Sequence, residues 1–267
     1  METNIARLRP EQIISVLNRR PVIFVPVGPL EWHGPHLPLG VDPLNAERVA
    51  LAVCEKAGGL VWPTLFWGTE RERPPQVLKN LGFRPDQYIV GMDFPNNPLP
   101  SGYCHEEIFA ILIRETLRLV RRMGARLAVI VNGHGAVNHN QVLQRLAVEL
   151  NRTTDLRVHV RIAFPEAGIK AGSIAHAGSD ETSLMMYLYP DTVDVSRLPP
   201  RDVPIRYPDF AIVDGPGFDG KGRPDKVVED DPRTKARIPK GEEAFRTVVE
   251  ETTREVETLL AAISAGQ

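Results

Sequence analysis

Hydrophobic positions along the chain follow two patterns, short continuous runs and longer stretches with helical spacing. The continuous runs predict buried strands at residues 21–27, 60–63, 127–131 and 157–163. The stretches with apolar residues three or four positions apart predict helices at residues 45–57, 106–123, 140–150, 181–188 and 242–263. Because strands and helices alternate, the pattern indicates an α/β fold with a parallel sheet covered on both faces.

Two long segments, residues 68–104 and 198–240, show little periodicity and contain many prolines. Irregular stretches of this length in a compact domain are usually functional loops or arms. We therefore expect substrate walls or subunit contacts there, although plain surface elaboration would leave the same pattern.

Composition excludes several classes of protein. The formal net charge of -2 and the scattered basic residues give no nucleic-acid footprint. The two cysteines, Cys54 and Cys104, lie far apart, which argues against a disulfide scaffold and fits a reducing compartment. The N-terminus lacks the order of a signal peptide, and no apolar run approaches the roughly 20 residues that span a bilayer. We expect a cytoplasmic protein that binds neither nucleic acid nor membrane.

Three polar clusters follow apolar runs or open a helix, and each contains histidine or carboxylate side chains. Their members are Glu31, His33, His36 and Asp42, then Asn132 and His134, and finally His176, Asp180 and Glu181. Ligands in α/β folds collect beyond the carboxyl ends of the strands, so separate strand ends can deliver side chains to one site. Imidazole and carboxylate without thiolate suit Zn²⁺ or Mn²⁺.

The spacing within the first cluster favours a metal site. Glu31 and His33 would share one face if the strand pleat persists. Asp42 then returns from a proline-stiffened loop and could bridge two cations about 3.5–4 Å apart. Each residue also has a simpler interpretation: Asp42 could cap the helix that begins near Asn45, and Glu181 could be a first-turn helix acid. Three such clusters together favour the metal site.

The stretches Glu-Trp-His-Gly-Pro-His-Leu-Pro-Leu-Gly-Val-Asp (31–42), Asn-Gly-His-Gly (132–135) and His-Ala-Gly-Ser-Asp-Glu-Thr-Ser (176–183) resemble the signature blocks of the creatininase (creatinine amidohydrolase) family. This resemblance implies one domain over residues 1–267, built as a three-layer α/β/α sandwich on a mostly parallel sheet. It also implies two divalent metal ions, Zn²⁺ or Mn²⁺, and a homo-oligomer, since members usually form hexamers.

Matched position by position, the resemblance implies the following metal ligands: Glu31, His33, Asp42 as the bridge, His134 and Glu181. His176 matches the histidine that handles protons. Creatininase itself has a Glu where this chain has Ala136, which strengthens the assignment of Glu181 and weakens creatinine as the substrate. His36 is expected to orient a ligand rather than bind metal. Candidate substrate contacts are Trp67, Tyr103, His105 and Gly135.

The predicted function is hydrolysis of an amide-type C–N bond of a small molecule, such as a cyclic amide or a formamide, by a hydroxide held between the two cations. His176 would donate a proton to the leaving nitrogen. Ring opening of a cyclic ketone or a lactone, or removal of terminal peptide residues, would use the same chemistry. A non-catalytic, metal-stabilised assembly protein is the alternative from another class.

Overall fold

The computed structural model describes residues 2–219 and 223–265. Four parallel strands form one sheet in the order β2-β1-β3-β4. Their bounds are β1 (Val22–Val27), β2 (Leu60–Val61), β3 (Leu127–Asn132) and β4 (Arg157–Ile162). Every residue of β1 and β3 is buried, which explains why these strands read as continuous apolar runs rather than alternating ones.

Helices connect and cover the strands. In chain order the α-helices of the described residues are α1 (Pro10–Arg19), α2 (Val41–Ala57), α3 (Pro75–Asn80), α4 (Glu106–Arg122), α5 (Val137–Thr153), α6 (Glu166–Ala171), α7 (Ser179–Leu188), α8 (Tyr207–Phe210), α9 (Gly215–Asp219), α10 (Pro232–Lys235) and α11 (Ile238–Ala265). Short 3-10 helices lie at Ile5–Arg7, Pro190–Thr192 and Val195–Arg197.

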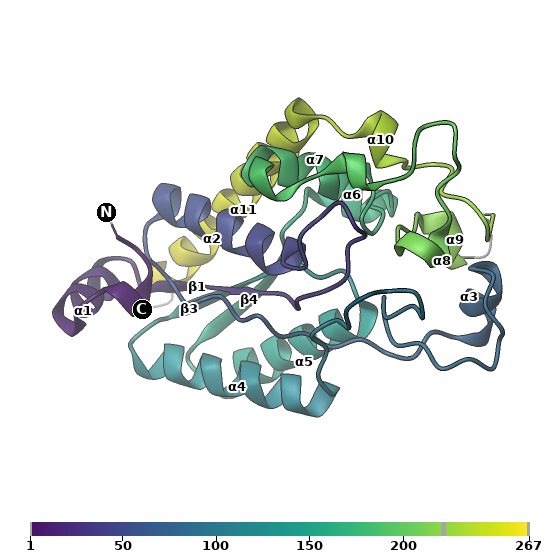
Figure 1. Ribbon diagram of the computed structural model, residues 1–267. Coiled ribbons are helices and arrows are strands. Elements are labelled where there is room, and N and C mark those ends of the chain that lie inside the picture. Colours follow the sequence, from purple (N-terminus) through teal and green to yellow (C-terminus); the bar gives the residue numbers. More distant parts are fainter. Residues whose placement is uncertain (1, 220–222, 266–267) are drawn as a thin grey trace.

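The sheet is the middle layer of a three-layer sandwich (Figure 1). Helices α4 and α5 cover one face, where Phe109 and Leu143 pack with Ile23 and Ile130. Helices α2 and α11 cover the other face. They pack on the strand side chains that point to that face, which alternate along each strand with those facing α4 and α5. The predicted three-layer α/β fold with a parallel sheet is therefore confirmed.

The predicted strands agree with the observed ones within two residues at each end, but four of the five predicted helices begin earlier than predicted. Helix α2 starts at Val41 rather than near residue 45, so Asp42 lies in its first turn and not in a loop. The loop stiffened by Pro35 and Pro38 ends before Val41, and Pro43 does not prevent a helix there because proline is well tolerated in a first helical turn. Helix α1 was missed, although it carries proline at its first position.

The two irregular segments form a third apolar cluster beside the sheet. Leu81 and Phe94 come from the segment 68–104, and Tyr207 and Val213 from the segment 198–240; all four are buried in it. Figure 1 shows α3, α8 and α9 close together at one end of the molecule. These segments therefore have a core of their own and are more ordered than the sequence indicated.

The chain makes its topological switch between β1 and β3. After β1 it enters α2 on one face, and after β3 it enters α5 on the other face. The two strands are neighbours, with Val27 paired to Asn132 at their carboxyl ends. Ligands in open α/β sheets bind in the crevice that such a divergence creates. The first two polar clusters follow these two strand ends.

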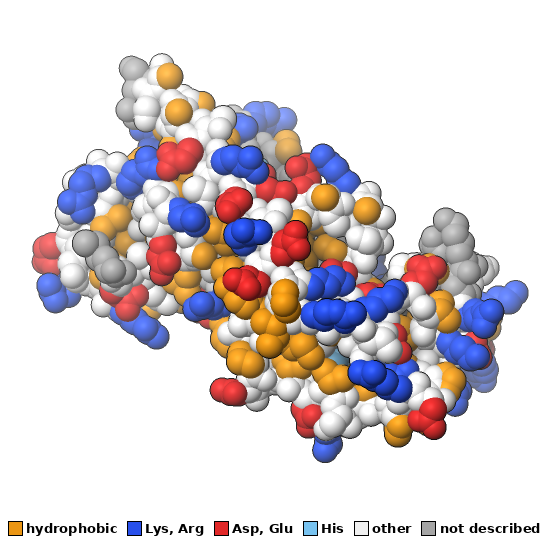
Figure 2. Space-filling model, turned by 90° about the horizontal axis from the view of Figure 1, so that it is seen from above, with side chains coloured by type: hydrophobic (Ala, Val, Ile, Leu, Met, Phe, Trp, Pro, Cys, Tyr) orange, Lys and Arg blue, Asp and Glu red, His pale blue; other side chains and the backbone are white. Residues whose placement is uncertain are grey.

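The surface carries both signs of charge. In Figure 2, acidic and basic side chains intermingle over the face on the side of α7 and α10, and hydrophobic side chains gather near its centre. Within residues 2–219 and 223–265, no helix is both long and apolar enough to span a membrane.

Candidate metal centre

Asp42 lies directly against the turns that follow β1 and β3. A Cβ atom on Gly133 would be 2.0 Å from the Asp42 carbonyl oxygen, and one on Gly28 would be 2.8 Å from the Asp42 Cβ. Both distances are well below van der Waals contact, so the approach of α2 requires glycine at these positions. The two glycines thereby set the position of the Asp42 carboxylate.

The Asp42 carboxylate lies between two buried histidines. Its Oδ2 lies 2.8 Å from Nδ1 of His134, and its Oδ1 lies 3.3 Å from Nε2 of His33. The residue is 3% exposed, so its carboxylate is shielded from bulk solvent. One carboxylate that directs an oxygen to each histidine has the geometry of a bridging ligand.

Glu31 approaches the same histidines from the loop after β1. Its Oε2 lies 3.4 Å from Nδ1 of His134 and 3.7 Å from Nδ1 of His176. Its Oε1 accepts a hydrogen bond from the hydroxyl of Tyr103, which in turn accepts one from the backbone N–H of Met92 at 3.1 Å. Tyr103, a candidate substrate contact in the sequence, therefore orients Glu31.

His33 has a buried ring nitrogen without a hydrogen-bond partner among the described residues. Its Nδ1 lies 3.0 Å from the carbonyl oxygen of Glu31 and so carries a proton, which leaves Nε2 to bind either a second proton or a cation. This Nε2 has no hydrogen bond. It faces carboxylate oxygens of Asp42, Glu181 and Glu31 at 3.3, 3.6 and 3.8 Å. A cation in this space would satisfy all four groups.

Glu181 reaches the cluster from the first turn of α7. Its Oε2, the oxygen that faces His33, accepts a hydrogen bond from the backbone N–H of Ala177 at 2.6 Å. Ala177 has a φ of 54°, in the left-handed region that residues other than glycine rarely adopt. This turn before α7 directs the N–H back to the carboxylate and fixes its orientation.

His176 lies at the edge of the cluster, with one ring nitrogen engaged. Its backbone pairs with Val213 through hydrogen bonds of 3.0 and 3.1 Å. Its Nε2 donates to the carbonyl oxygen of Trp32 at 2.7 Å, so Nδ1 holds the lone pair. Since Nδ1 faces Glu31, it is the ring atom of His176 that can exchange a proton within the site.

The charges in the cluster shift the pKa values of its members in opposite directions. Burial lowers the pKa of His33, but the carboxylates of Glu181 and Asp42 outweigh burial and raise it to about 10. Burial raises the pKa of Glu181 to about 7, against the attraction of His33. Burial and the neighbouring His33 lower the pKa of His176 to about 4, so its imidazole is neutral. Positive charge is thus favoured between the carboxylates and disfavoured on His176.

His36 lies outside the donor set, and its side chain contacts the neighbour of a donor rather than a donor itself. Its Nε2 lies 3.0 Å from the hydroxyl of Thr182, the neighbour of Glu181 in α7. No bond from His36 to a donor side chain occurs among the described residues. Its contact with the site is therefore through α7, the helix that carries Glu181. His139 also lies beside the site, with its ring centroid 5.0 Å from that of His134.

The donors fall into overlapping groups that could each hold a cation. Ligand atoms within each group lie within 4.8 Å of one another, and the groups are Glu31, Asp42 and His134; His33, Asp42 and Glu181; and Glu31, His33 and His176. Asp42 belongs to the first two groups. No Lys or Arg forms an ion pair with these carboxylates in the part of the chain that the structure describes. Three buried carboxylates without a basic partner fit a site for divalent cations.

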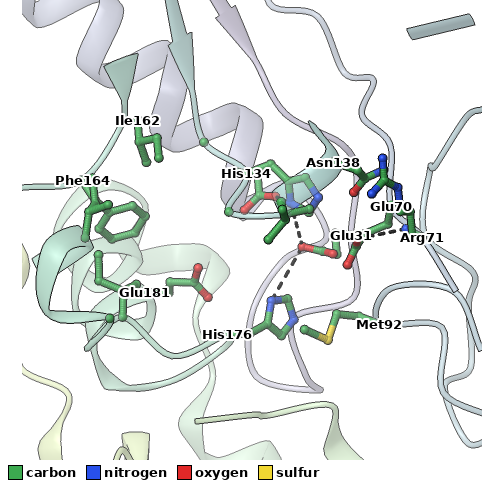
Figure 3. A pocket seen from close by; sticks show the side chains of 18 of the residues that line it. Glu31, Glu70, Arg71, Met92, His134, Asn138, Ile162, Phe164, His176 and Glu181 are labelled. Carbon is green, nitrogen blue, oxygen red and sulfur yellow. Dashed lines mark hydrogen bonds and ion pairs between the residues drawn. The ribbon is translucent and has the colours of Figure 1, made fainter. Parts of the chain in front are cut away.

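A pocket of about 590 Å³ opens onto the donors. Figure 3 shows the donors between one wall that carries Ile162 and Phe164 and an opposite wall that carries Glu70, Arg71 and Asn138. The apolar wall was not predicted. Its signal in the sequence is the set of apolar residues between the strand at 157–163 and His176.

The candidate substrate contacts lie in different places. Gly135 lines the pocket, and a Cβ atom built on it would meet nothing within 4 Å. Trp67 is 50% exposed and does not line the pocket. His105 lines a second hollow together with Tyr103 and Glu107. The structure therefore brings Gly135 to the donors and leaves Trp67 and His105 outside the pocket.

Fold and site together define a class of enzyme, a metal-dependent hydrolase with its donors at the switch point of a parallel sheet. A family model for Creatininase (Creatinine amidohydrolase) matches residues 6–86 and 103–256. The chain therefore belongs to the creatininase family, whose members are metal-dependent amidohydrolases, and the prediction of a hydrolase is confirmed.

Relatives with different names share this sequence pattern. The creatinine amidohydrolase of Pseudomonas putida is 31% identical over 204 residues, which cover 68% of this chain and 71% of that protein. The mycofactocin precursor peptide peptidase of Mycobacterium ulcerans is 32% identical over 187 residues, covering 67% of this chain. The second match spans only 62% of the peptidase. The names of the relatives therefore do not agree on one substrate.

Solved structures share the fold over nearly the whole chain. A crystal structure of creatinine amidohydrolase (creatininase) superposes with a TM-score of 0.67 at 24% identity and covers 97% of this chain and 98% of that one. Structures described as "Creatininase Mn" and as a creatininase variant of "Zn-Zn type" match with the same TM-score.

Proposed function

We propose that this protein is a two-metal hydrolase that cleaves an amide-type C–N bond of a small molecule. The observation that carries the proposal is the position of Asp42, which directs one oxygen to His134 and the other to His33. Each histidine belongs to a separate donor group, and Asp42 is common to both. A shared carboxylate is how two-metal hydrolases hold their cations close together.

The residues divide into two ligand sets. Glu31, Asp42 and His134 would hold one cation, and His33, Asp42 and Glu181 the other. The second set lacks the Glu that creatininase has at the position of Ala136, and Glu181 takes its place 3.6 Å from His33. Oxygen and nitrogen donors of this kind accept Zn²⁺ or Mn²⁺, the metals in the descriptions of two similar structures.

The protein side chains divide the chemical work. Cations held by these residues would supply a water of lowered pKa and would polarise the substrate carbonyl. His176 takes a proton at Nδ1 and delivers it to the leaving nitrogen, because Nε2 is held by Trp32. Glu31 faces the same Nδ1 at 3.7 Å and stabilises the ring while it carries the proton. The hydrogen bond from Tyr103 keeps Glu31 in that orientation.

Metal analysis combined with a hydrolysis screen tests the proposal. The purified protein is expected to contain two divalent ions per chain and to free an amino group by opening cyclic amides or by cleaving formamides or short peptides. The His134→Ala variant should lose metal and turnover, since it removes a donor. The His176→Ala variant should retain metal and lose most of the rate, typically 10²–10⁴-fold for a group that transfers a proton. Full activity in metal-free protein would disprove the proposal.

Opening of a cyclic ketone or a lactone at the same site is the second candidate. It shares the donors and His176, and it differs in the leaving group. Formation of a free amino group or ammonia, which only cleavage of a C–N bond gives, separates the two chemistries directly. The non-catalytic alternative is disfavoured by the pocket, because structural metal sites are usually closed by four protein ligands whereas these donors line an open pocket.

A homo-oligomer is part of the same proposal. On the outer face of α4, Ile108, Ile111 and Leu112 are 49%, 57% and 38% exposed and lie at helical spacing. An exposed apolar stripe of this kind is typical of a subunit contact. Light scattering coupled to size-exclusion chromatography should give a mass that is a multiple of 29.7 kDa.

A further inference from the structure

One wall of the pocket is apolar and belongs to none of the three hydrophobic cores. Ile162 ends β4, Phe164 follows two residues later, Ile169 lies in α6, and Ile174 precedes His176; all four line the pocket. We name residues 162–174 the apolar arm. None of these four side chains is a member of the core clusters. Ile162, Ile169 and Ile174 are half-buried and Phe164 is buried, and each of them borders the space above the donors.

The apolar arm is held in place at both ends. At its start, the backbone N–H of Glu166 donates to Glu251 of α11 at 3.0 Å, and the same Glu251 pairs with Arg161. At its end, the backbone of His176 pairs with Val213. These contacts place the apolar wall before any ligand arrives, so little ordering energy is spent when an apolar group binds against it.

Hydrogen bonds also hold the turn that follows α6 inside the arm. The backbone N–H groups of Gly172 and Ser173 donate to the carbonyl oxygens of Ile169 and Gly168 at 3.1 and 3.2 Å, which ends α6. A Cβ atom on Gly168 would lie 3.3 Å from Cδ1 of Ile174. The side chain of Ile174 therefore packs onto α6, and Ile169 and Ile174 present a joined apolar surface.

The opposite wall carries charged residues that pair with one another, beside the apolar side chains of Val77 and Met92. Arg73 pairs with Glu70 at 2.7 Å, and Nε of Arg71 pairs with Glu106 at 2.5 Å. This wall offers hydrogen-bond donors and acceptors side by side, without a surplus of one sign. It suits the polar part of an amide, whereas the apolar arm suits a hydrocarbon part. In Figure 3 the donors lie between the two walls.

The size of the pocket agrees with a ligand larger than one small ring. Its volume of about 590 Å³ lies within the range of roughly 300–1,000 Å³ typical of sites for drug-sized ligands. A single five-membered ring bound at the donors would leave the apolar arm in contact with water. Such a ligand would gain nothing from the hydrophobic surface that the arm supplies.

From these observations we infer that the substrate is an open-chain amide with a sizeable apolar group, which binds against Ile162, Phe164, Ile169 and Ile174 while its polar part lies along residues 70–73. This inference rests on the proposed function and names the class of substrate for it. Specificity would then be set by the arm, and the donors would supply only the chemistry.

Two matched series of open-chain amides test the inference. N-acylglycines from acetyl to octanoyl extend the apolar group on the acyl side, and N-acetyl amino acids from Ala to Leu to Phe extend it on the amine side. We expect kcat/KM to rise at least tenfold along one of the series, because each buried methylene contributes to binding. Release of the free amine measures turnover of the open-chain amides, and creatinine, whose ring opening to creatine is measured separately, serves as the small polar comparison.

Variants in the arm show whether this wall is the cause. Ile169→Ala and Ile174→Ala replace half-buried side chains and should lower kcat/KM about tenfold for the longest substrate while leaving the shortest nearly unchanged. Val148→Ala is the matched control, since Val148 is 66% exposed on α5 and does not line the pocket. It should not change the dependence on chain length.

Binding separates this inference from the proposed function. In the His176→Ala variant, calorimetry should give an affinity for octanoylglycine at least tenfold higher than for acetylglycine, and Ile174→Ala should remove that difference. Amide hydrolysis that is independent of chain length in both series would overturn the inference and leave the proposed function intact. Tight binding of long ligands without hydrolysis of any amide would overturn the proposed function. It would leave intact the assignment of the arm as the wall that binds an apolar group.

Discussion

At the scale of single residues, the site depends on a few hydrogen bonds that orient donors rather than on the donors alone. Tyr103 holds one oxygen of Glu31, and the backbone of Ala177 holds one oxygen of Glu181. The bond to Glu31 leaves its Oε2 free to face the histidines, and the bond to Glu181 fixes the same Oε2 that faces His33. Ligands oriented in this way bind metal more tightly because less freedom is lost on binding.

The Tyr103→Phe substitution tests this role at the residue scale. It removes the hydroxyl donor to Glu31 and leaves the ring in place, so metal affinity should fall about 10–100-fold, as is usual for such outer partners. Competition with a chelating dye measures the affinity. Tyr88→Phe is the control, since Tyr88 is 74% exposed. Unchanged metal affinity in Tyr103→Phe would favour a substrate contact instead.

Residue identity was easier to predict from the sequence than residue position. The blocks containing Glu31, His134 and Glu181 were recognisable because their spacing is specific. The role of Tyr103 was not predictable, because it depends on a contact between residues 72 positions apart in the chain. Such contacts are set by packing of the segment 68–104, which has no periodic pattern to interpret.

At the scale of elements, the close approach of α2 to the strand ends determines the geometry of the site. The backbone of Asp42 lies where a side chain on Gly133 would be. A helix beginning at Val41 can bring its first turn there only if that position carries no Cβ. The sequence showed the glycines but not the helix start, so it could not show which element they accommodate.

Gly133→Ala and Gly135→Ala form a matched pair of variants. Alanine at position 133 would place Cβ 2.0 Å from the Asp42 carbonyl oxygen, so we expect a loss of at least about 2 kcal/mol of stability together with weaker metal binding. Alanine at position 135 meets nothing within 4 Å and should change stability by less than about 0.5 kcal/mol. Urea unfolding measures both. Equal stability of the two variants would contradict this account.

The contact between the first loop and α7 should make stability sensitive to acid. Burial lowers the pKa of His36 to about 3 in the folded protein, whereas an unfolded histidine has a pKa near 6.5. Between these values the unfolded state binds the extra proton, so stability is fully present above about pH 6.5 and falls as the pH decreases, by at most about 1.4 kcal/mol per pH unit.

The His36→Gln variant isolates that contribution. Its stability is expected to fall less than that of the wild type between pH 7 and pH 5, by about 1–2 kcal/mol in urea unfolding. Other groups titrate equally in both proteins and cancel in the comparison. Parallel pH profiles for the two proteins would show that His36 does not contribute.

At the scale of the whole molecule, the donors tie together distant parts of the chain. Glu31 and Asp42 follow β1, His134 follows β3, and Glu181 lies in α7. The donor set exists only when all of these elements are assembled. Bound cations should therefore stabilise the folded state and not the unfolded chain.

Removal of metal tests this coupling. A ligand present at about 1,000 times its Kd stabilises a protein by about 4 kcal/mol, and each kcal/mol shifts Tm by about 2–4 °C for a chain of this size. We expect a chelator to lower Tm by about 10 °C and Zn²⁺ or Mn²⁺ to restore it. In the Asp42→Asn variant, Tm should be the same with and without chelator. A wild-type Tm that does not respond to chelator would contradict the metal centre.

The separation between the apolar arm and the three cores has a consequence for the evolution of this enzyme. Substitutions at half-buried positions outside a core change stability little, so residues such as Ile169 and Ile174 can vary without unfolding the protein. Substitutions at Gly133 or Asp42 would instead disturb the packing or the donors of the site. Natural selection can therefore exchange one substrate for another by altering the arm while the reaction itself is inherited unchanged. A lineage with this design can acquire new specificities in single steps, each of which leaves a working hydrolase.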